Sequence, residues 1–230
     1  MTAIIKLLSA GAVKPGLMKV IESFQSAGGH DVTIGFATAP EIRRRLQEGE
    51  AADIVIAPND LVDALMMKGQ VASADRAVIG RIGVGVMVRE DLPAPQIATV
   101  EAFQTSLLNA ESIVYNQAST GTYIDSLFDR LGIAAQMKTK TTRYADFAAV
   151  LEHIRRDRSS ELGLGATTVI IENANRGIKF IGPLPAEIQN YTTYAAAVAT
   201  HRIAGDGASA LLRFLTSASA KHLFTAAGIE

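Results

Sequence analysis

The sequence predicts an α/β fold of two lobes, in which each lobe is a mostly parallel sheet flanked by helices. Three observations support this prediction. Strand-like and helix-like segments alternate from the start of the chain, which is typical of βαβ units with a parallel sheet. The alternation breaks near residue 84, where glycine alternates with apolar residues, and a second α/β series follows. The length of 230 residues suits one large domain or two small ones that fold together.

The composition is that of an ordinary globular protein and argues against several functional classes. Hydrophobic residues make up 48% and charged residues 20%, and the formal net charge is −1. The basic surplus typical of nucleic-acid binding is therefore absent, and no apolar run approaches the roughly 20 residues that span a bilayer. The chain has no cysteine, and its four histidines are widely scattered. We expect no metal site, no cofactor, no nucleic-acid partner and no membrane span.

The first α/β series contains three strand–helix pairs. Its strands are expected at residues 4–8, 32–37 and 53–57. Apolar residues spaced three and four apart predict an amphipathic helix after the first strand, with one face formed by Leu17, Val20, Ile21 and Phe24. A second helix is expected at residues 39–47. The third helix ends at Met67, and we expect Asn59 or Asp60 to cap its start.

The second series follows an exposed, proline-bearing break at residues 91–95. Its strands are expected at residues 112–115, 178–181 and 194–199, its helices at residues 121–131 and 145–155, and a helical pattern ends the chain. We therefore assign residues 1–84 and 195–230 to lobe I and residues 85–194 to lobe II. In such a fold the ligand cleft is expected between the lobes, at the carboxyl ends of the strands.

Three strand-to-helix turns carry small residues that would let an anion approach the backbone. Free N–H groups and the positive end of the helix dipole meet at such turns, so anions bind there without a cationic side chain. The candidate binding residues are Ser9, Gly11 and Ala12 in the first turn, Thr38 and Ala39 in the second, and Ser119 and Thr120 in the third. Simple capping of the third helix by Ser119 or Thr120 is the competing interpretation.

Two larger side chains complete the candidate site outside these turns. Arg81 lies just before the glycine-rich strand, where a guanidinium can clamp a carboxylate, although a solvent-exposed arginine is the competing interpretation. Tyr115 ends a buried strand, so it belongs either to the core or to the rim of a cleft. The sequence contains no nucleophile elbow, no phosphate-binding loop and no cluster of metal ligands.

The order of segments resembles the molybdate- and tungstate-binding proteins of ABC importers. The most specific motif is Leu46-x-x-Gly49-x-x-Ala52-Asp53-Ile54, and residues 7–13, 36–39 and 120–123 match as well. The resemblance implies a type II periplasmic-binding-protein fold, whose two lobes close on the ligand like a hinge. It also implies a small anionic ligand and, if the protein is exported, the membrane subunits of an ABC importer as partners.

This sequence departs from the family at the side chains that hold the oxyanion. Members of the family use two serine hydroxyls, several backbone N–H groups and a tyrosine hydroxyl. In this sequence the two serines fall on Ala12 and Ala39, the tyrosine falls on Thr168, and two backbone contacts fall on Thr120 and Phe147. Each missing hydrogen bond to a buried oxyanion costs roughly 1–3 kcal/mol. A bulkier organic anion, such as a di- or tricarboxylate, therefore suits these positions better than molybdate.

Two functions remain open at this point. The first is a solute-binding protein that delivers a small anion to an importer. The second is a cytoplasmic enzyme on the same scaffold, such as an isomerase of a small unsaturated carboxylate resembling aconitate isomerases, with Tyr115, Tyr144 or Asp60 as the acid or base. The location follows the function: periplasmic if a signal peptide was removed from this sequence, and cytoplasmic otherwise.

Overall fold

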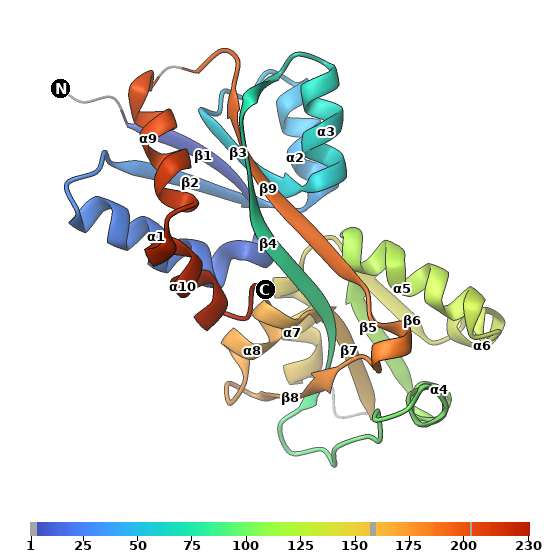
Figure 1. Ribbon diagram of the computed structural model, residues 1–230. Coiled ribbons are helices and arrows are strands. Elements are labelled where there is room, and N and C mark those ends of the chain that lie inside the picture. The colour runs from blue at the N-terminus through green and yellow to red at the C-terminus, as the bar shows by residue number, and fades with distance from the viewer. Residues whose placement is uncertain (1–3, 157–159, 203) are drawn as a thin grey trace. The chain divides into compact units, whose positions relative to one another are not determined.

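The computed structural model describes residues 4–156, 160–202 and 204–230, which form two compact units (Figure 1). Unit 1 contains Met1–Ile82 and Thr192–Glu230, and unit 2 contains Gly83–Tyr191. Two long strands, β4 (Val71–Arg89) and β9 (Tyr191–Ala199), carry the chain from one unit to the other. The predicted α/β fold class is confirmed, because each unit is a sheet flanked by helices.

The sheet of unit 1 is parallel over its first three strands. These strands are β1 (Ile5–Ala10), β2 (Val32–Ala37) and β3 (Ile54–Pro58), and the order in the sheet is β2-β1-β3-β9. Strand β1 is parallel to both β2 and β3, with Ser9 beside Phe36 and Ile56, whereas β9 is antiparallel to β3. The carboxyl ends of β1, β2 and β3 therefore lie at one edge of the sheet.

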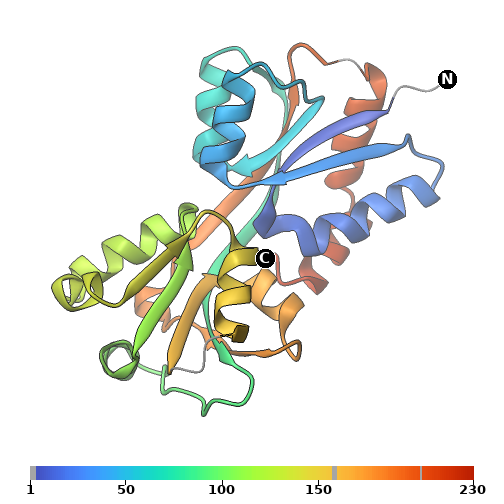
Figure 2. The same cartoon turned by 180° about the vertical axis from the view of Figure 1, so that it is seen from behind.

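Helices cover both faces of this sheet, as Figures 1 and 2 show. On one side α1, α9 and α10 contact one another, and on the other α2 packs on β1 and β3 while α3 packs on β3. The predicted apolar stripe of α1 is buried. The bounds are α1 Lys14–Ser26, α2 Ala39–Gln47, α3 Asn59–Met67, α9 Asp206–Leu215 and α10 Ala218–Ala226.

Unit 2 has a second parallel core, formed by β6-β5-β7. Strand β5 (Ser112–Asn116) is parallel to β6 (Thr141–Tyr144) and to β7 (Glu161–Ala166). Strand β4 is antiparallel to β7 and to β8 (Ile178–Pro183). The carboxyl ends of β5, β6 and β7 consequently share one edge.

Two hydrophobic clusters lie on opposite faces of the unit 2 sheet. One contains residues of α4 (Val100–Asn109), α5 (Ser119–Arg130) and α6 (Ala134–Lys138), and the other contains residues of α7 (Phe147–Arg156) and α8 (Thr167–Asn173). Neighbouring residues of β5 alternate between them, since Ile113 and Tyr115 belong to the first cluster and Val114 to the second. This alternation is what the two-residue period of a strand requires.

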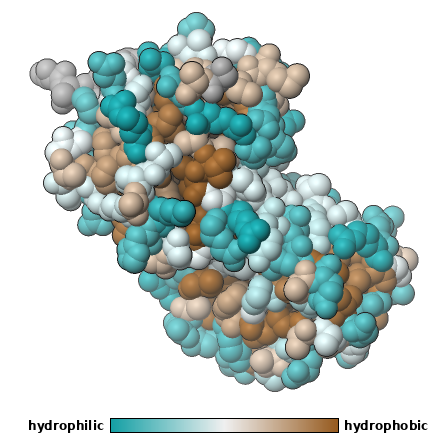
Figure 3. All heavy atoms as spheres, in the orientation of Figure 1, coloured by the Kyte–Doolittle hydropathy of each residue, from teal (hydrophilic) through white to brown (hydrophobic). Residues whose placement is uncertain are grey.

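The surface carries few large apolar side chains, and they are dispersed. Hydrophilic and hydrophobic residues are interspersed over the face shown in Figure 3, and the most exposed large apolar residue is Met67, at 89%. Isolated exposed apolar residues of this kind are normal for globular proteins. Among the described residues, no helix combines the length and the apolar character needed to cross a membrane.

The predicted cap of α3 is wrong, and so is the competing interpretation in which Ser119 or Thr120 caps α5. Helix α3 has Pro58 as its N-cap residue, so Asn59 and Asp60 lie in its first turn and do not cap it. Helix α5 has Ala118 as its N-cap residue, so the hydroxyls of Ser119 and Thr120 likewise lie inside the first turn. In both cases the helix begins one or two residues earlier than its polar residues suggest.

Several elements have no counterpart among the predictions. Strand β7 reads Glu-Leu-Gly-Leu-Gly-Ala, and its alternating glycines argue against a strand because glycine lacks a side chain that packs. A Cβ on Gly163 would lie 2.5 Å from Met87 Cε, so a larger residue at this position would force the Met87 side chain of β4 to shift. The other unpredicted elements are α4, α6, β6, α8 and the first half of β4.

Candidate functional site

The carboxyl edge of the unit 1 sheet carries the predicted residues of the first two turns. Strand β1 ends at Ala10 and is followed by Gly11 and Ala12 in a short 3-10 helix, Gly11–Val13. Strand β2 ends at Ala37, with Thr38 as the N-cap residue of α2 and Ala39 as its first residue. Because β1 and β2 are parallel and in register to their last residues, these two turns are neighbours.

Side chains at the first turn leave room beside the backbone. A Cβ built on Gly11 would meet no atom within 4 Å, so open space lies next to this residue. The Ser9 side chain is fully buried, and its hydroxyl donates to the carbonyl oxygen of Ala10 at 3.3 Å. The backbone of this turn is therefore better placed to meet a ligand than the Ser9 hydroxyl.

The unit 2 sheet brings together the four other predicted residues at its carboxyl edge. Ser119 and Thr120 begin α5 after β5, Phe147 begins α7 after β6, and Thr168 lies in the first turn of α8 after β7. The three strands are parallel, so their following turns share this edge. Thr120 and Thr168 are buried at 8% and 1% exposure.

Two glycines allow the close packing of this edge. A Cβ on Gly121 would overlap the carbonyl oxygen of Asn116, so glycine lets the first turn of α5 lie against the end of β5. A Cβ on Gly165 would overlap the ring of Phe147, so glycine lets that ring rest on the backbone of β7. The positions of the α5 and α7 amino termini thus depend on glycine, which has no side chain, at these two positions.

Most helices that follow these parallel strands begin without a side-chain cap. In the described residues, no cap hydrogen bond is made by the side chains of the N-cap residues of α2, α3 and α5, which are Thr38, Pro58 and Ala118. By contrast, Thr99 caps α4, Ser217 caps α10, and Asp146 accepts from Ala149 N at 2.9 Å in α7. Helix α8, which follows β7, also lacks a side-chain cap. So do α1, α6 and α9, none of which directly follows a parallel strand. First-turn N–H groups have no partner inside the helix, so this pattern leaves donors for an anion.

Arg81 and Tyr115 are not at these turns. The Arg81 guanidinium is paired with Glu230, with Nη2 2.9 Å from Oε2, and the two residues also exchange backbone hydrogen bonds. Tyr115 is 1% exposed within the first hydrophobic cluster of unit 2, and its hydroxyl donates to Asp125 Oδ1 at 2.5 Å. Burial and the neighbouring Asp125 raise the pKa of Tyr115 above its ordinary value. Both side chains have partners within their own unit.

The start of α3 carries a polar group that the sequence did not reveal. The Arg76 guanidinium donates to Asn59 Oδ1, and its Nη2 lies 3.0 Å from Asp63 Oδ1. Arg76 Nε is buried and has no hydrogen-bond partner in the structure described. The nearby Tyr194 side chain is also buried, and burial followed by the Asp60 carboxylate raises its pKa. Arg76 was missed because it lies in the unpredicted first half of β4.

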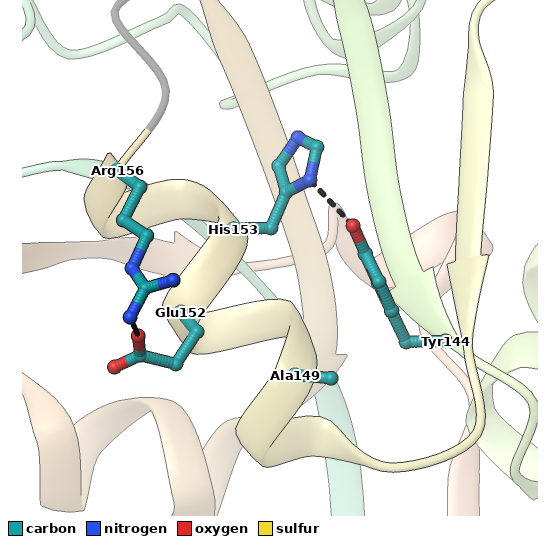
Figure 4. A pocket seen from close by; sticks show the side chains of 5 residues that line it. All are labelled: Tyr144, Ala149, Glu152, His153 and Arg156. Atoms are coloured by element: carbon teal, nitrogen blue, oxygen red, sulfur yellow. Dashed lines mark hydrogen bonds and ion pairs between the residues drawn. The ribbon is translucent and has the colours of Figure 1, made fainter.

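A second polar group lies under α7. In Figure 4 the Tyr144 side chain of β6 points toward His153 of α7, and its hydroxyl lies 2.7 Å from His153 Nδ1. His153 Nε2 lies 2.8 Å from Oε1 of Glu161, a buried residue of β7. The Ser112 hydroxyl also donates to that oxygen. A surface hollow of about 440 Å³ adjoins the group and is lined by Tyr144, Ala149, Glu152, His153 and Arg156.

We interpret the Tyr144–His153–Glu161 group as a structural connection. Both ring nitrogens of His153 are engaged, so neither is left to accept a proton from a ligand. Ser112 and Glu161 are paired at the amino ends of β5 and β7, which is the edge opposite the turns. The group therefore connects α7 to the edge of the sheet at which β5 and β7 begin.

Comparisons with known proteins agree on the family and the fold. The family described as bacterial extracellular solute-binding protein matches residues 5–230. The periplasmic molybdate-binding protein of Azotobacter vinelandii superimposes with a TM-score of 0.81 at 14% identity, covering 98% of both chains. The sulfate-binding protein of Mycobacterium tuberculosis has a TM-score of 0.80 at 15% identity, covering 99% of this chain and 86% of that one.

A curated relative has a different activity in its name. The aconitate isomerase of a Pseudomonas species is 28% identical over 232 residues, which cover 97% of this chain and 86% of that protein. At this identity the likeness does not carry the activity over to this chain. The match over residues 5–230 nevertheless shows the family, and the solved structures show the fold: this chain belongs to the bacterial extracellular solute-binding proteins and has the type II binding-protein fold.

Proposed function

We propose that this chain binds a small organic anion with two or three carboxylates at its strand-to-helix turns. One observation carries the proposal: in each unit, helices that follow parallel strands begin without a side-chain cap, α2 and α3 in unit 1 and α5 in unit 2. Their first-turn N–H groups supply hydrogen bonds and a positive potential for a carboxylate. Gly11, with open space beside it, gives a ligand access to the backbone of a neighbouring turn.

The choice of an organic anion rests on the side chains at the turns. The resemblance to molybdate-binding proteins implies serine hydroxyls at the positions of Ala12 and Ala39, and neither alanine can donate. Losing two hydrogen bonds to a charged ligand at about 1.5–3 kcal/mol each weakens binding at least a hundredfold. The smaller side chains also leave space for a larger ligand.

A thermal-shift screen tests the ligand class. We expect citrate, tricarballylate or aconitate to raise the melting temperature, because a ligand at 100 times its Kd stabilises the folded state by about 2.7 kcal/mol. Molybdate and sulfate should give no shift at the same concentration. A strong shift with molybdate and none with the carboxylates would contradict the proposal.

Restoring the hydroxyls should change the ligand preference. In the double variant A12S/A39S we expect molybdate affinity to rise by about 100-fold, since two donors return, and tricarboxylate affinity to fall. Isothermal titration calorimetry measures both affinities. Ala94→Ser, in the exposed break before α4, is the control and should leave both affinities unchanged. Equal behaviour of the double variant and the control would refute the role of these two turns.

A second candidate function is isomerisation of a small unsaturated carboxylate. It is supported by the likeness, over 97% of this chain, to a protein named aconitate isomerase. The test is incubation with cis-aconitate and quantification of the trans isomer by proton NMR. A protein that is stabilised by aconitate but leaves it unchanged acts as a receptor only.

The two functions imply different partners and locations. A receptor of this family delivers its ligand to the membrane subunits of an ABC importer, which places it outside the cytoplasmic membrane. An enzyme needs no such partner and fits either compartment. Fractionation of the native host separates the two cases: recovery in the periplasm is expected for the receptor, and exclusive recovery in the cytosol would contradict it.

A further inference from the structure

The Asp60 carboxylate lies at the start of α3, where we propose that a negatively charged ligand binds. It is the second residue of α3 and is exposed, and no ion pair or hydrogen bond of its side chain is found in the described part of the chain. Its neighbours Asn59 and Asp63 are engaged with Arg76 instead. Asp60 stabilises the start of α3 through the helix dipole, but its carboxylate repels an anion bound nearby, so it weakens the binding of an anion by a pure receptor.

Tyr194 lies beside this carboxylate. It is opposite Pro58 in the antiparallel pairing of β9 with β3, and its side chain is 4% exposed. No hydrogen bond of its hydroxyl is found among the residues described, and its oxygen is not one of the buried atoms left without a partner, so solvent or a ligand can reach it. Burial and the Asp60 carboxylate raise the pKa of Tyr194, so its hydroxyl stays neutral and can donate a hydrogen bond.

The strand register places this pair at the same edge as the first turn. Ser9 lies beside Ile56 in the parallel pairing of β1 with β3, so the turn that begins at Gly11 and the end of β3 at Pro58 lie at the same edge of the sheet. Tyr194 is the partner of Pro58, and Asp60 follows two residues later. The uncapped start of α3, the space beside Gly11 and the two side chains therefore belong to one edge of one unit.

We infer that Asp60 and Tyr194 form a proton-transfer pair acting on an unsaturated di- or tricarboxylate that has a CH2 group next to its double bond. The inference rests on the proposed binding of an organic anion at these turns and assigns the chemistry of the isomerase candidate to named residues. Asp60 is the base and Tyr194 is the hydrogen-bond donor. Together they give a role in the reaction to a carboxylate and a hydroxyl for which no hydrogen bond is found among the residues described.

The reaction is an allylic proton shift that needs no co-reactant. The Asp60 carboxylate removes a proton from the CH2 carbon, and the electrons of that C–H bond spread through the double bond into the adjacent carboxylate as a dienolate. The Tyr194 hydroxyl donates to the carboxylate oxygen on which negative charge grows, which stabilises the transition state. Asp60 then returns the proton to the far carbon of the allylic unit. The double bond has moved by one position, and both residues have regained their starting forms.

The test combines deuterium exchange with a separate binding measurement. Wild-type protein in D2O is incubated with cis- and trans-aconitate, and proton NMR follows isomerisation and loss of the CH2 signal. Affinity is measured by calorimetry with tricarballylate, a saturated analogue that has no double bond to move. We expect Asp60→Asn to lower both rates by at least about 100-fold while tricarballylate binds as well or more tightly. Tyr194→Phe should lower both rates by roughly 10- to 100-fold, below the full effect of an oxyanion-hole donor because one donor of several is removed.

Matched controls separate the chemistry from general effects. Asp206→Asn removes another exposed aspartate from the first turn of a helix in unit 1, and Tyr191→Phe removes an exposed hydroxyl from β9. Both should keep wild-type rates. If the wild type binds tricarballylate but catalyses no exchange, the inference fails and the proposed binding function stands. If Asp60→Asn keeps its exchange rate, another base is responsible and the inference also fails. If no carboxylate binds, both proposals fall.

Discussion

Two glycines determine how closely the unit 2 turns approach the sheet. Gly121 and Gly165 sit where any side chain would overlap a neighbour, the Asn116 carbonyl in one case and the Phe147 ring in the other. Gly11 differs, because a Cβ there would meet nothing within 4 Å. At the scale of single residues, glycine therefore has two roles at these edges: it permits close packing in unit 2 and leaves open space in unit 1.

Substitution of Gly165 should destabilise the protein. In Gly165→Ala the new methyl displaces the Phe147 ring, and overpacking of this kind costs about 1–3 kcal/mol. Gly11→Ala is the control and should stay within about 0.5 kcal/mol of wild type, since its surroundings are empty. Urea denaturation followed by circular dichroism measures both. Equal stability of the two variants would mean that the Phe147 ring moves aside without cost.

Tyr194 should make the folded state sensitive to alkali. Its pKa is raised in the folded protein and returns to about 10 in the unfolded chain. Above pH 10 the unfolded state therefore binds fewer protons than the folded state, so stability falls as the pH rises. Tyr194→Phe should show a shallower loss of stability between pH 10 and 11 than wild type, whereas Tyr191→Phe should follow wild type. Parallel curves for all three proteins would contradict this.

Helix α7 is held in place by contacts at its start and by a second set of contacts farther along its length. At its start, Asp146 caps the first turn, and the Phe147 ring rests on β7. Farther along, His153 connects the helix to β6 through Tyr144 and to β7 through Glu161. At the scale of elements, this arrangement fixes the amino terminus of α7 beside the turns of α5 and α8.

Removing the imidazole should loosen this helix. In His153→Ala the buried Glu161 carboxylate loses a donor, and Ser112 remains as its partner. We expect a loss of about 2–3 kcal/mol, because leaving a buried charge poorly paired is costly. Amide hydrogen exchange should accelerate over α7 in particular. His222→Ala, at an exposed position, should change neither stability nor exchange, and a similar result for His153→Ala would argue against the connection.

At the scale of the whole molecule, the alternation of patterns was sufficient to predict the α/β class and many elements. The predicted ranges 32–37 and 39–47 coincide with β2 and α2, because apolar spacing and a following proline mark them clearly. Strand β7 was missed because two of its residues are glycines, which have no side chain to form an apolar pattern. Strand β6 was missed because it is four residues long and partly polar. The division into lobes that close on a ligand stays a prediction.

The positions of the strand-to-helix turns were predictable, whereas the side-chain groups that depend on long-range contacts were missed. Strand ends and small residues predicted the turns at Gly11 and Thr38 in unit 1 and at Thr120 in unit 2, because each turn follows a parallel strand of its own unit. That these turns bind a ligand stays a prediction. The partnership of Arg76 with Asn59 and the pairing of Tyr194 with Pro58 join residues far apart in sequence. No local pattern reports such contacts, so these side chains emerged only from the folded chain.

The division of unit 1 into two separate segments has a consequence for synthesis. Unit 2 is one continuous stretch, Gly83–Tyr191, whereas unit 1 needs β9, α9 and α10 from Thr192–Glu230 to complete what Met1–Ile82 begins. On the ribosome, the first strands of unit 1 therefore emerge before the segment that completes their sheet. Unit 2 can fold before that segment has been synthesised. Because chain growth is slow compared with the folding of a small domain, the exposed apolar faces of α1 and β1 have time to meet a chaperone.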